Sequence, residues 1–132
     1  MRTNRILRAV PDHSFVRLDN GGRHSVLRVI RDVDIASVVH LDEAIAALAA
    51  EPVVVIDLDA CPYFDSTGLT VLLRRLKTQA MVIVLPASSA IHRTFEVTGL
   101  LNIFRVVETV SDAQKAADEM LALKLAHAAL NR

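Results

Sequence analysis

Two short runs of apolar, largely β-branched residues predict the centre of a β-sheet. Residues 53–58 read Val-Val-Val-Ile-Asp-Leu, and residues 81–85 read Met-Val-Ile-Val-Leu. Runs of this length without polar alternation are typical of strands buried on both faces. The segment between them has helical spacing, so the succession of strand, helix and strand predicts a right-handed parallel crossover.

Four segments have apolar residues at the spacing of an α-helix. The segment between the two strands is amphipathic, because Leu69, Leu72, Leu73 and Leu76 are spaced i, i+3, i+4 and i+7. The other three helices are expected before the first apolar strand up to Ala50, near residues 88–98 with an end at Gly99, and after a capping-box pair of Ser111 and Gln114.

The beginning of the chain predicts an antiparallel hairpin. Strand-like residues 14–18 and 25–30 flank Asn20-Gly21-Gly22, where both glycines tolerate positive φ. Residues 104–107 predict a short last strand. The fold class is therefore α/β: a mixed β-sheet opened by an N-terminal hairpin and packed with about four α-helices, with one face less covered than the other.

The length of 132 residues fits one domain with a real core. Residues 1–12 are interpreted as an N-terminal lead or edge strand, and residues 13–132 as the domain itself, including a long C-terminal helix. Hydrophobic residues make up 52% of the chain and charged residues 23%, which is typical of an ordered globular protein.

Charge and hydropathy exclude several classes of protein. Fifteen basic residues balance fifteen acidic ones, which argues against binding to nucleic acid or to an anionic membrane. No apolar stretch approaches the roughly 18 residues needed to cross a bilayer, and the N-terminal apolar stretch is too short for a signal peptide. The single cysteine, Cys61, permits no intrachain disulfide and is interpreted as a small buried residue. We expect a cytoplasmic protein without direct membrane insertion.

The motifs for enzyme chemistry are weak or incomplete. Asp57-Leu58-Asp59 resembles the pair of a small aspartyl phosphotransferase, but Asp57 lies within the apolar run. Ser66 lacks the glycine that a nucleophile elbow requires two residues earlier, where Phe64 stands. Neither metal-ligand spacing nor a phosphate-binding glycine loop occurs. We therefore expect no enzymatic activity, no metal and no cofactor.

The junction between the first apolar strand and its helix, Phe64-Asp65-Ser66-Thr67-Gly68-Leu69, concentrates the candidate chemistry. Asp65, Ser66 and Thr67 are all residue types that cap helices by accepting from unpaired N–H groups. The alternative interpretation is a modification site, since free N–H groups and the positive dipole end stabilise an added phosphate. The residues alone leave both interpretations open.

Three segments together resemble the STAS domain family, and within it the bacterial anti-sigma-factor antagonists. The resemblance covers roughly residues 14–117. The segments, in chain order, are Val33-Asp34-Ile35-Ala36, then Asp57-Leu58-Asp59-Ala60 followed by Phe64-Asp65-Ser66-Thr67-Gly68-Leu69, and finally Phe95-Glu96-Val97-Thr98-Gly99-Leu100.

The resemblance implies a partner-switching module that regulates transcription, as in stress responses. In the family, an anti-sigma factor with serine kinase activity phosphorylates the serine that corresponds to Ser66, and a PP2C-type phosphatase removes the phosphate. The unphosphorylated form binds the anti-sigma factor. Thr67 is a lesser phosphoacceptor candidate, and the implied partner surface comprises Asp34, Asp65, Thr67, Gly68, Leu69 and Thr70.

The sequence departs from the family pattern in places, among them an N-terminal lead longer than in the smallest members, and it leaves alternatives open. Arg31 and Asp32 replace the usual Gly-Glu, and the link between Lys77 and Met81 lacks the usual glycine pair. The alternatives are a STAS scaffold or a transporter-associated subunit without sigma-factor switching. A further alternative is the small aspartyl phosphotransferase. The oligomeric state, the sigma factor and the signal are not specified by the sequence.

Overall fold

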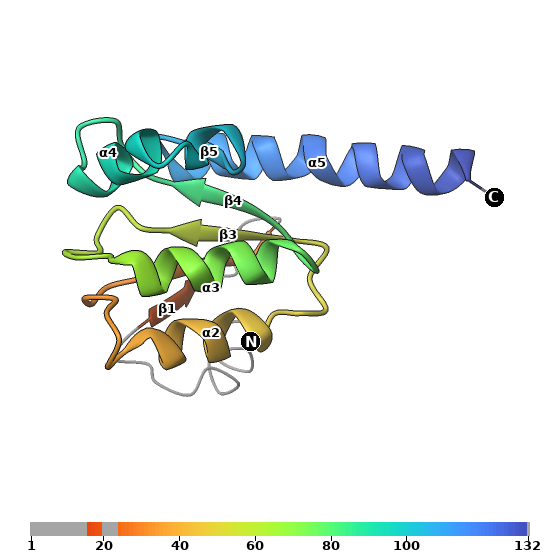
Figure 1. Cartoon of the computed structure of the whole chain (residues 1–132). Helices are drawn as coiled ribbons and strands as arrows, with labels where there is room; N and C mark the ends of the chain where they lie inside the picture. The colour runs from red at the N-terminus through yellow and green to blue at the C-terminus, as the bar shows by residue number, and fades with distance from the viewer. Residues whose placement is uncertain (1–15, 20–23, 132) are drawn as a thin grey trace.

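The computed structural model describes residues 16–19 and 24–131. These residues contain a five-stranded sheet in the order β1-β2-β3-β4-β5 (Figure 1). β1 pairs antiparallel with β2, and all other neighbouring strands are parallel. The mixed sheet is thus confirmed. The strands are β1 (Val16–Asp19), β2 (Val26–Val29), β3 (Val53–Asp57), β4 (Ala80–Val84) and β5 (Arg105–Val107).

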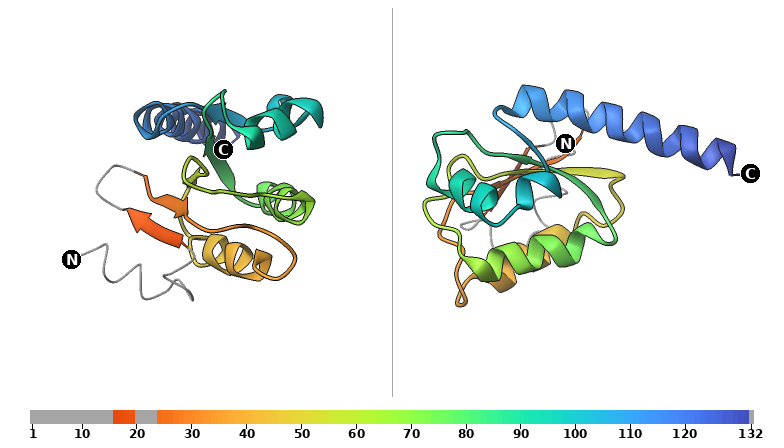
Figure 2. Two further views of the ribbon diagram at one scale, coloured as in Figure 1. Left: turned by 90° about the vertical axis from the view of Figure 1, so that its left-hand side faces the viewer. Right: turned by 45° about the horizontal axis from the view of Figure 1, so that its top comes forward.

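Helices cover the two faces of the sheet unequally. Figure 2 shows α2, α3 and α4 on one face and α5 by itself on the other. The predicted imbalance between the faces is therefore confirmed for the described part of the chain. The helices are α2 (Val38–Ala46), α3 (Ser66–Leu76), α4 (Ala90–Val97), the 3-10 helix η1 (Leu100–Asn102) and α5 (Val110–Leu130).

The central strands are apolar throughout because each of their faces is buried against helices. Val54 and Ile56 of β3 belong to the core beneath α2, α3 and α4. Val53 and Val55, which alternate with them, belong to the core beneath α5. Since successive strand residues point to opposite faces, a strand buried on both faces needs an uninterrupted apolar run.

The N-terminal half of α5 packs on the sheet through small side chains. Ala113, Ala116 and Ala117 are buried against β3 and β4, and their size lets the helix lie close to the valines of those strands. The C-terminal part of the helix extends past the edge of the sheet (Figure 1), and residues 122–131 are exposed. Only the first half of α5 therefore contributes to the core.

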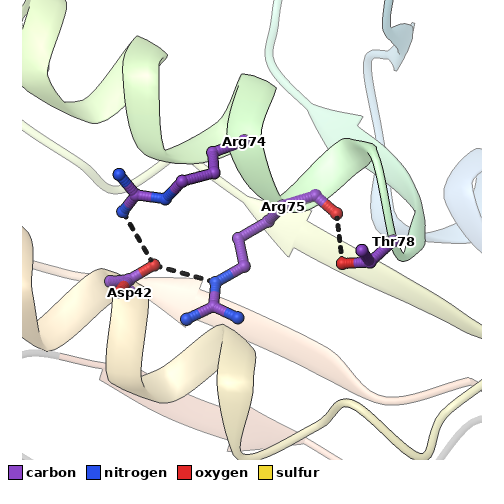
Figure 3. A network of polar contacts seen from close by, with 4 residues as sticks. All are labelled: Asp42, Arg74, Arg75 and Thr78. Carbon is purple, nitrogen blue, oxygen red and sulfur yellow. Dashed lines mark hydrogen bonds and ion pairs between the residues drawn. The ribbon is translucent and has the colours of Figure 1, made fainter.

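A polar network joins α2 to α3. The Asp42 carboxylate accepts hydrogen bonds from Arg75 Nε at 2.8 Å and from Arg74 at 3.3 Å (Figure 3). The hydrogen bond from Arg75 is the main reason why the pKa of Asp42 is lowered from its ordinary value. Arg74 and Arg75, which lie in the last turn of α3, thus link this helix to α2.

Several sequence expectations about helix ends are corrected. The capping box at Ser111 and Gln114 is wrong, since Thr109 caps α5 by accepting from the N–H of Asp112 at 3.0 Å. The helix expected to run to Ala50 ends at Ala46, and turns follow. The end of α4 is confirmed, because Gly99 adopts the left-handed conformation with φ of 78°.

Some expectations lie outside the described residues. These are the N-terminal lead at 1–12, the beginning of the first strand and the Asn20-Gly21-Gly22 turn. The antiparallel pairing of β1 with β2, which such a turn would join, is present. No helix among residues 16–19 and 24–131 is both long and apolar enough to cross a bilayer.

Candidate functional site

Two loops meet at the carboxyl ends of β2 and β3 and are held together by a parallel bridge. Val33 pairs with Phe64. Its N–H donates to the carbonyl of Tyr63 at 2.8 Å, and its carbonyl accepts from the N–H of Asp65 at 3.1 Å. The bridge therefore brings Asp34 beside Asp65 and Ser66, so two of the three family-like segments form one site.

Buried side chains support this bridge from below. Val33 and Phe64 both lie in the core, and Phe64 neighbours the Phe95 ring at a centroid distance of 6.5 Å. Cys61 is buried with its sulfur 3.3 Å from the carbonyl oxygen of Arg31 and 3.1 Å from that of Tyr63. Burial raises the pKa of its thiol to about 11, so Cys61 is a neutral donor that ties the two loops together.

Asp65 caps α3. It has extended backbone geometry, and its Oδ1 accepts from the N–H of Thr67 at 2.9 Å and from the Thr67 hydroxyl. The hydrogen bond from the Thr67 hydroxyl is the main reason why the pKa of Asp65 is lowered. The carboxylate at the helix start is therefore an anion with its own donors.

Ser66 is the first residue of α3 and is exposed. No residue in the described part of the chain makes a hydrogen bond with its hydroxyl, whereas its carbonyl accepts from the Thr70 hydroxyl at 2.9 Å. The expectation that Ser66 could cap the helix is thus corrected, because Asp65 takes that role. The Ser66 side chain remains accessible without any change in the helix.

The remaining predicted residues of this helix occupy different environments. The Thr67 hydroxyl is engaged with Asp65, and Thr70 is exposed one turn further along. Leu69 is only 8% exposed and packs in the core. Gly68 is also buried: a Cβ at this position would lie 2.6 Å from Cζ of Phe64. Gly68 and Leu69 thus support the surface from beneath.

Asp34 organises the turn that precedes α2. Its Oδ1 accepts from the N–H groups of Ala36 at 3.0 Å and Ser37 at 3.1 Å. Asp34 thus stabilises the turn that leads into α2, in which Ser37 is the residue before the helix. Asp34 is half-buried, and its carboxylate lies at the same edge of the sheet as Asp65.

Asp57, the candidate nucleophile of the phosphotransferase alternative, is only 2% exposed. Its Oδ1 accepts from the N–H of Asp59 at 2.9 Å, and its Oδ2 lies 3.4 Å from Nε of Arg28. Burial raises the pKa of Asp57, and this effect outweighs the attraction of Arg28. Among the described residues, no three His, Cys, Asp or Glu side chains gather as a metal site.

The structure also exposes apolar residues that sequence analysis did not assign to the site. Ile35 is 82% exposed in the turn after Asp34, and Tyr63 is 53% exposed beside Phe64. Tyr63 directly precedes the bridge residue Phe64, and Ile35 follows the bridge residue Val33 by two positions. Strand alternation would place Ile35 on the same side as buried Val33, so this pattern does not indicate its exposure.

The chain belongs to the STAS domain family: the family model matches residues 16–113. The matched span contains β1 to β5 and the base of α5, so it includes the bridge, Ser66 and the sheet that supports them. A comparison with the curated proteins found no match to this sequence.

The solved structures similar to this chain include anti-sigma-factor antagonists. One from Mycobacterium paratuberculosis is 27% identical, with a TM-score of 0.69 over 76% of this chain and 91% of that chain. An anti-sigma-factor antagonist (STAS) domain protein from Planctomyces limnophilus is 22% identical, with a TM-score of 0.61 over 76% of this chain and 95% of the other.

The phosphorylated form of the Bacillus cell fate determinant SpoIIAA is also similar. It is 18% identical, with a TM-score of 0.56 over 80% of this chain and 98% of that one. At this identity the likeness shows a shared fold.

Proposed function

We propose that this protein is a cytoplasmic anti-sigma-factor antagonist whose unphosphorylated form binds an anti-sigma factor with serine kinase activity. Phosphorylation of Ser66 releases that partner, and a PP2C-type phosphatase restores the binding form. The observation that carries the proposal is the exposed Ser66 hydroxyl at the start of α3, without a hydrogen bond to any described residue.

The surroundings of Ser66 suit recognition by a protein. The partner surface comprises Asp34, Asp65, Thr67 and Thr70 around Ser66, with Gly68 and Leu69 beneath. Asp34 and Asp65 come from separate loops that the Val33–Phe64 bridge joins. Because the helix start, the turn and the sheet edge are all hydrogen-bonded internally, this surface is preorganised for binding.

A phosphate on Ser66 would be attracted by the start of α3 and repelled by the Asp65 carboxylate. The helix start attracts an anion, but the N–H of Thr67 already serves the Asp65 carboxylate. The phosphate would therefore add about −1.5 to −2 charges beside an existing anion. In a closing protein interface these charges must lose water, so phosphorylation should disfavour the complex more than the isolated fold.

The buried position of Asp57 does not favour the phosphotransferase alternative, because its carboxylate is enclosed by β-sheet neighbours. The scaffold and transporter-subunit alternatives share the same fold and differ in their dependence on Ser66. Binding experiments with variants at this residue therefore distinguish them from partner switching.

The proposal is tested by affinity capture with wild-type protein, Ser66→Asp and Ser66→Ala, followed by identification of the captured proteins. Wild-type protein and Ser66→Ala should capture an anti-sigma factor, and Ser66→Asp should not. Thr78→Asp is the matched control, since it places the same charge on an exposed residue beyond the opposite end of α3, and it should still capture the anti-sigma factor. Equal capture of the anti-sigma factor by all four proteins would contradict switching at Ser66.

A further inference from the structure

Three exposed apolar side chains lie on the segments that meet beside Ser66. Ile35 is 82% exposed, Val39 52% and Tyr63 53%. Ile35 and Val39 are four residues apart, with a helical turn between them in which the N–H of Val38 donates to the carbonyl of Asp34. Tyr63 is joined to the same region through its carbonyl, which accepts from Val33. We call Ile35, Val39 and Tyr63 the apolar anchor.

The exposed anchor residues contrast with the bridge residues of the same loops, which are buried. Val33 and Phe64, the bridge residues next to the anchor, are 0% and 5% exposed. Large apolar side chains in contact with water are common singly but mark an interaction site when they gather beside a binding surface. The anchor is continuous with the proposed partner surface through the hydrogen bonds between Val33, Tyr63 and Asp65.

The charges around the anchor specify the chemistry of its occupant. Asp32 and Asp59 are exposed, and Asp34 and Asp65 are half-buried, at the edge where the two loops meet. Arg31 is the sole cation in the sequence of residues 31–37 and 58–66. An acidic edge around apolar side chains is complementary to an apolar recess bordered by lysine or arginine.

We propose that the apolar anchor seats in such a recess on the anti-sigma factor and supplies the selectivity for unphosphorylated Ser66. This inference rests on the proposed function. A basic border attracts both phosphorylated and unphosphorylated protein, so long-range attraction does not discriminate between them. Closure of the apolar contact does discriminate, because a phosphate on Ser66, next to the bridge that joins the two loops, would have to lose its water as the interface closes.

The apolar anchor and the surrounding acidic residues should affect different steps of binding. The anchor sets the dissociation rate and the ratio of affinities for the two forms, because apolar groups buried at interface centres dominate binding. The exposed carboxylates Asp32 and Asp59 set the association rate and its dependence on salt.

The test uses the full chain and the purified anti-sigma factor that has serine kinase activity. Affinities are measured for the unphosphorylated and the kinase-phosphorylated forms of wild type, Ile35→Ala and Leu123→Ala. Leu123 is a matched control, since it is 71% exposed on α5, which covers the opposite face of the sheet. Both substitutions remove exposed apolar atoms, so neither is expected to alter the fold.

The expected result is about a tenfold or greater loss of affinity of unphosphorylated Ile35→Ala, as for an interface anchor, with a smaller ratio between its two forms. Leu123→Ala should match wild type in its affinity and in the ratio between its two forms. If the kinase phosphorylates Ser66 but Ile35→Ala binds like wild type, the inference is overturned and the proposed function stands. If wild-type protein is neither bound nor phosphorylated, the proposed function is overturned and the inference with it.

Discussion

Asp65 and Ser66 are adjacent in the chain, but the structure assigns them separate tasks. The carboxylate of Asp65 satisfies the N–H of Thr67 at the start of α3, whereas the hydroxyl of Ser66 faces solvent. Capping therefore does not depend on the residue that we propose is modified. A variant at Ser66 can report on regulation while the helix stays intact, and a variant at Asp65 reports on the helix.

Replacement of Asp65 by Ala should lower the free energy of unfolding at pH 7. The folded state holds the pKa of Asp65 below its ordinary value, so its stabilisation is present at neutral pH and is lost as the pH falls below about 4. Urea unfolding at pH 7 and in acid should show a difference from wild type that shrinks in acid. Ser66→Ala serves as the control and should match wild type at both values; a pH-independent loss for Asp65→Ala would contradict the role of the charge.

Asp57 should respond to pH in the opposite sense. Burial raises its pKa in the folded state, so ionisation of Asp57 opposes folding and its effect appears as the pH rises through the range where the unfolded chain loses the proton. Asp57→Asn keeps an acceptor for the N–H of Asp59 and should be at least as stable as wild type at pH 7. Urea unfolding measures this difference, and a marked loss of stability would show that the pair with Arg28 outweighs desolvation.

At the scale of elements, the sequence predicted the helices and strands whose pattern is strong and missed features that depend on tertiary contacts. The apolar runs of β3 and β4 were recognisable because both faces of these strands are buried. The pattern of α3 did not predict that Val71 is buried while Leu73 and Leu76 are only half-buried. The neighbouring helix α2 determines which side of α3 is covered. Helical spacing alone does not specify such a neighbour.

The candidate site was predictable in its residues but less so in its geometry. Asp34, Asp65 and Ser66 were indicated by their order in family-like segments. The bridge that joins them was not, since Val33–Phe64 is a single long-range pair outside the named strands. The exposure of Ile35 likewise results from the path of the turn after Asp34, which its own apolar character would not predict.

Gly68 of α3 lies against the ring of Phe64, so a larger residue at this position should lower the free energy of unfolding. Gly68→Ala gains about 1 kcal/mol of helix propensity, but its Cβ would lie 2.6 Å from the Phe64 ring, and such overpacking costs about 1–3 kcal/mol. We expect a net loss of about 1 kcal/mol in urea unfolding. The double variant with Phe64→Leu is the control, because the smaller side chain should remove the penalty of the added methyl group; an equal penalty in both backgrounds would contradict the contact.

At the scale of the whole molecule, the sheet separates a site-bearing side from a side covered by one helix. The loops at the carboxyl ends of β2 and β3 carry Asp34 and Ser66, and the cores on both faces hold these strands rigid. The outer half of α5 lies beyond the sheet (Figure 1) and belongs to neither core. The site should therefore be independent of that outer half.

A chain that ends at Leu121 should fold and keep its site. Residues 122–131 are exposed, and the hydrogen bond from Lys124 to the carbonyl of Pro52 lies at the surface. The free energy of unfolding should change by less than about 1 kcal/mol, as for surface changes elsewhere. Urea unfolding of the truncated chain measures this; loss of cooperative unfolding would show that the outer half of α5 stabilises the domain.

Modification of Ser66 is tested directly by phosphorylation of the full chain with ATP and the purified anti-sigma-factor kinase, with the phosphate mapped by mass spectrometry. Wild-type protein and Thr67→Ala should each gain one phosphate, located on Ser66, and Ser66→Ala should gain none. Binding of the kinase should fall as the phosphate is added. Undiminished labelling of Ser66→Ala would show that another residue is modified, and equal binding before and after labelling of wild type would show that the phosphate does not control the partner.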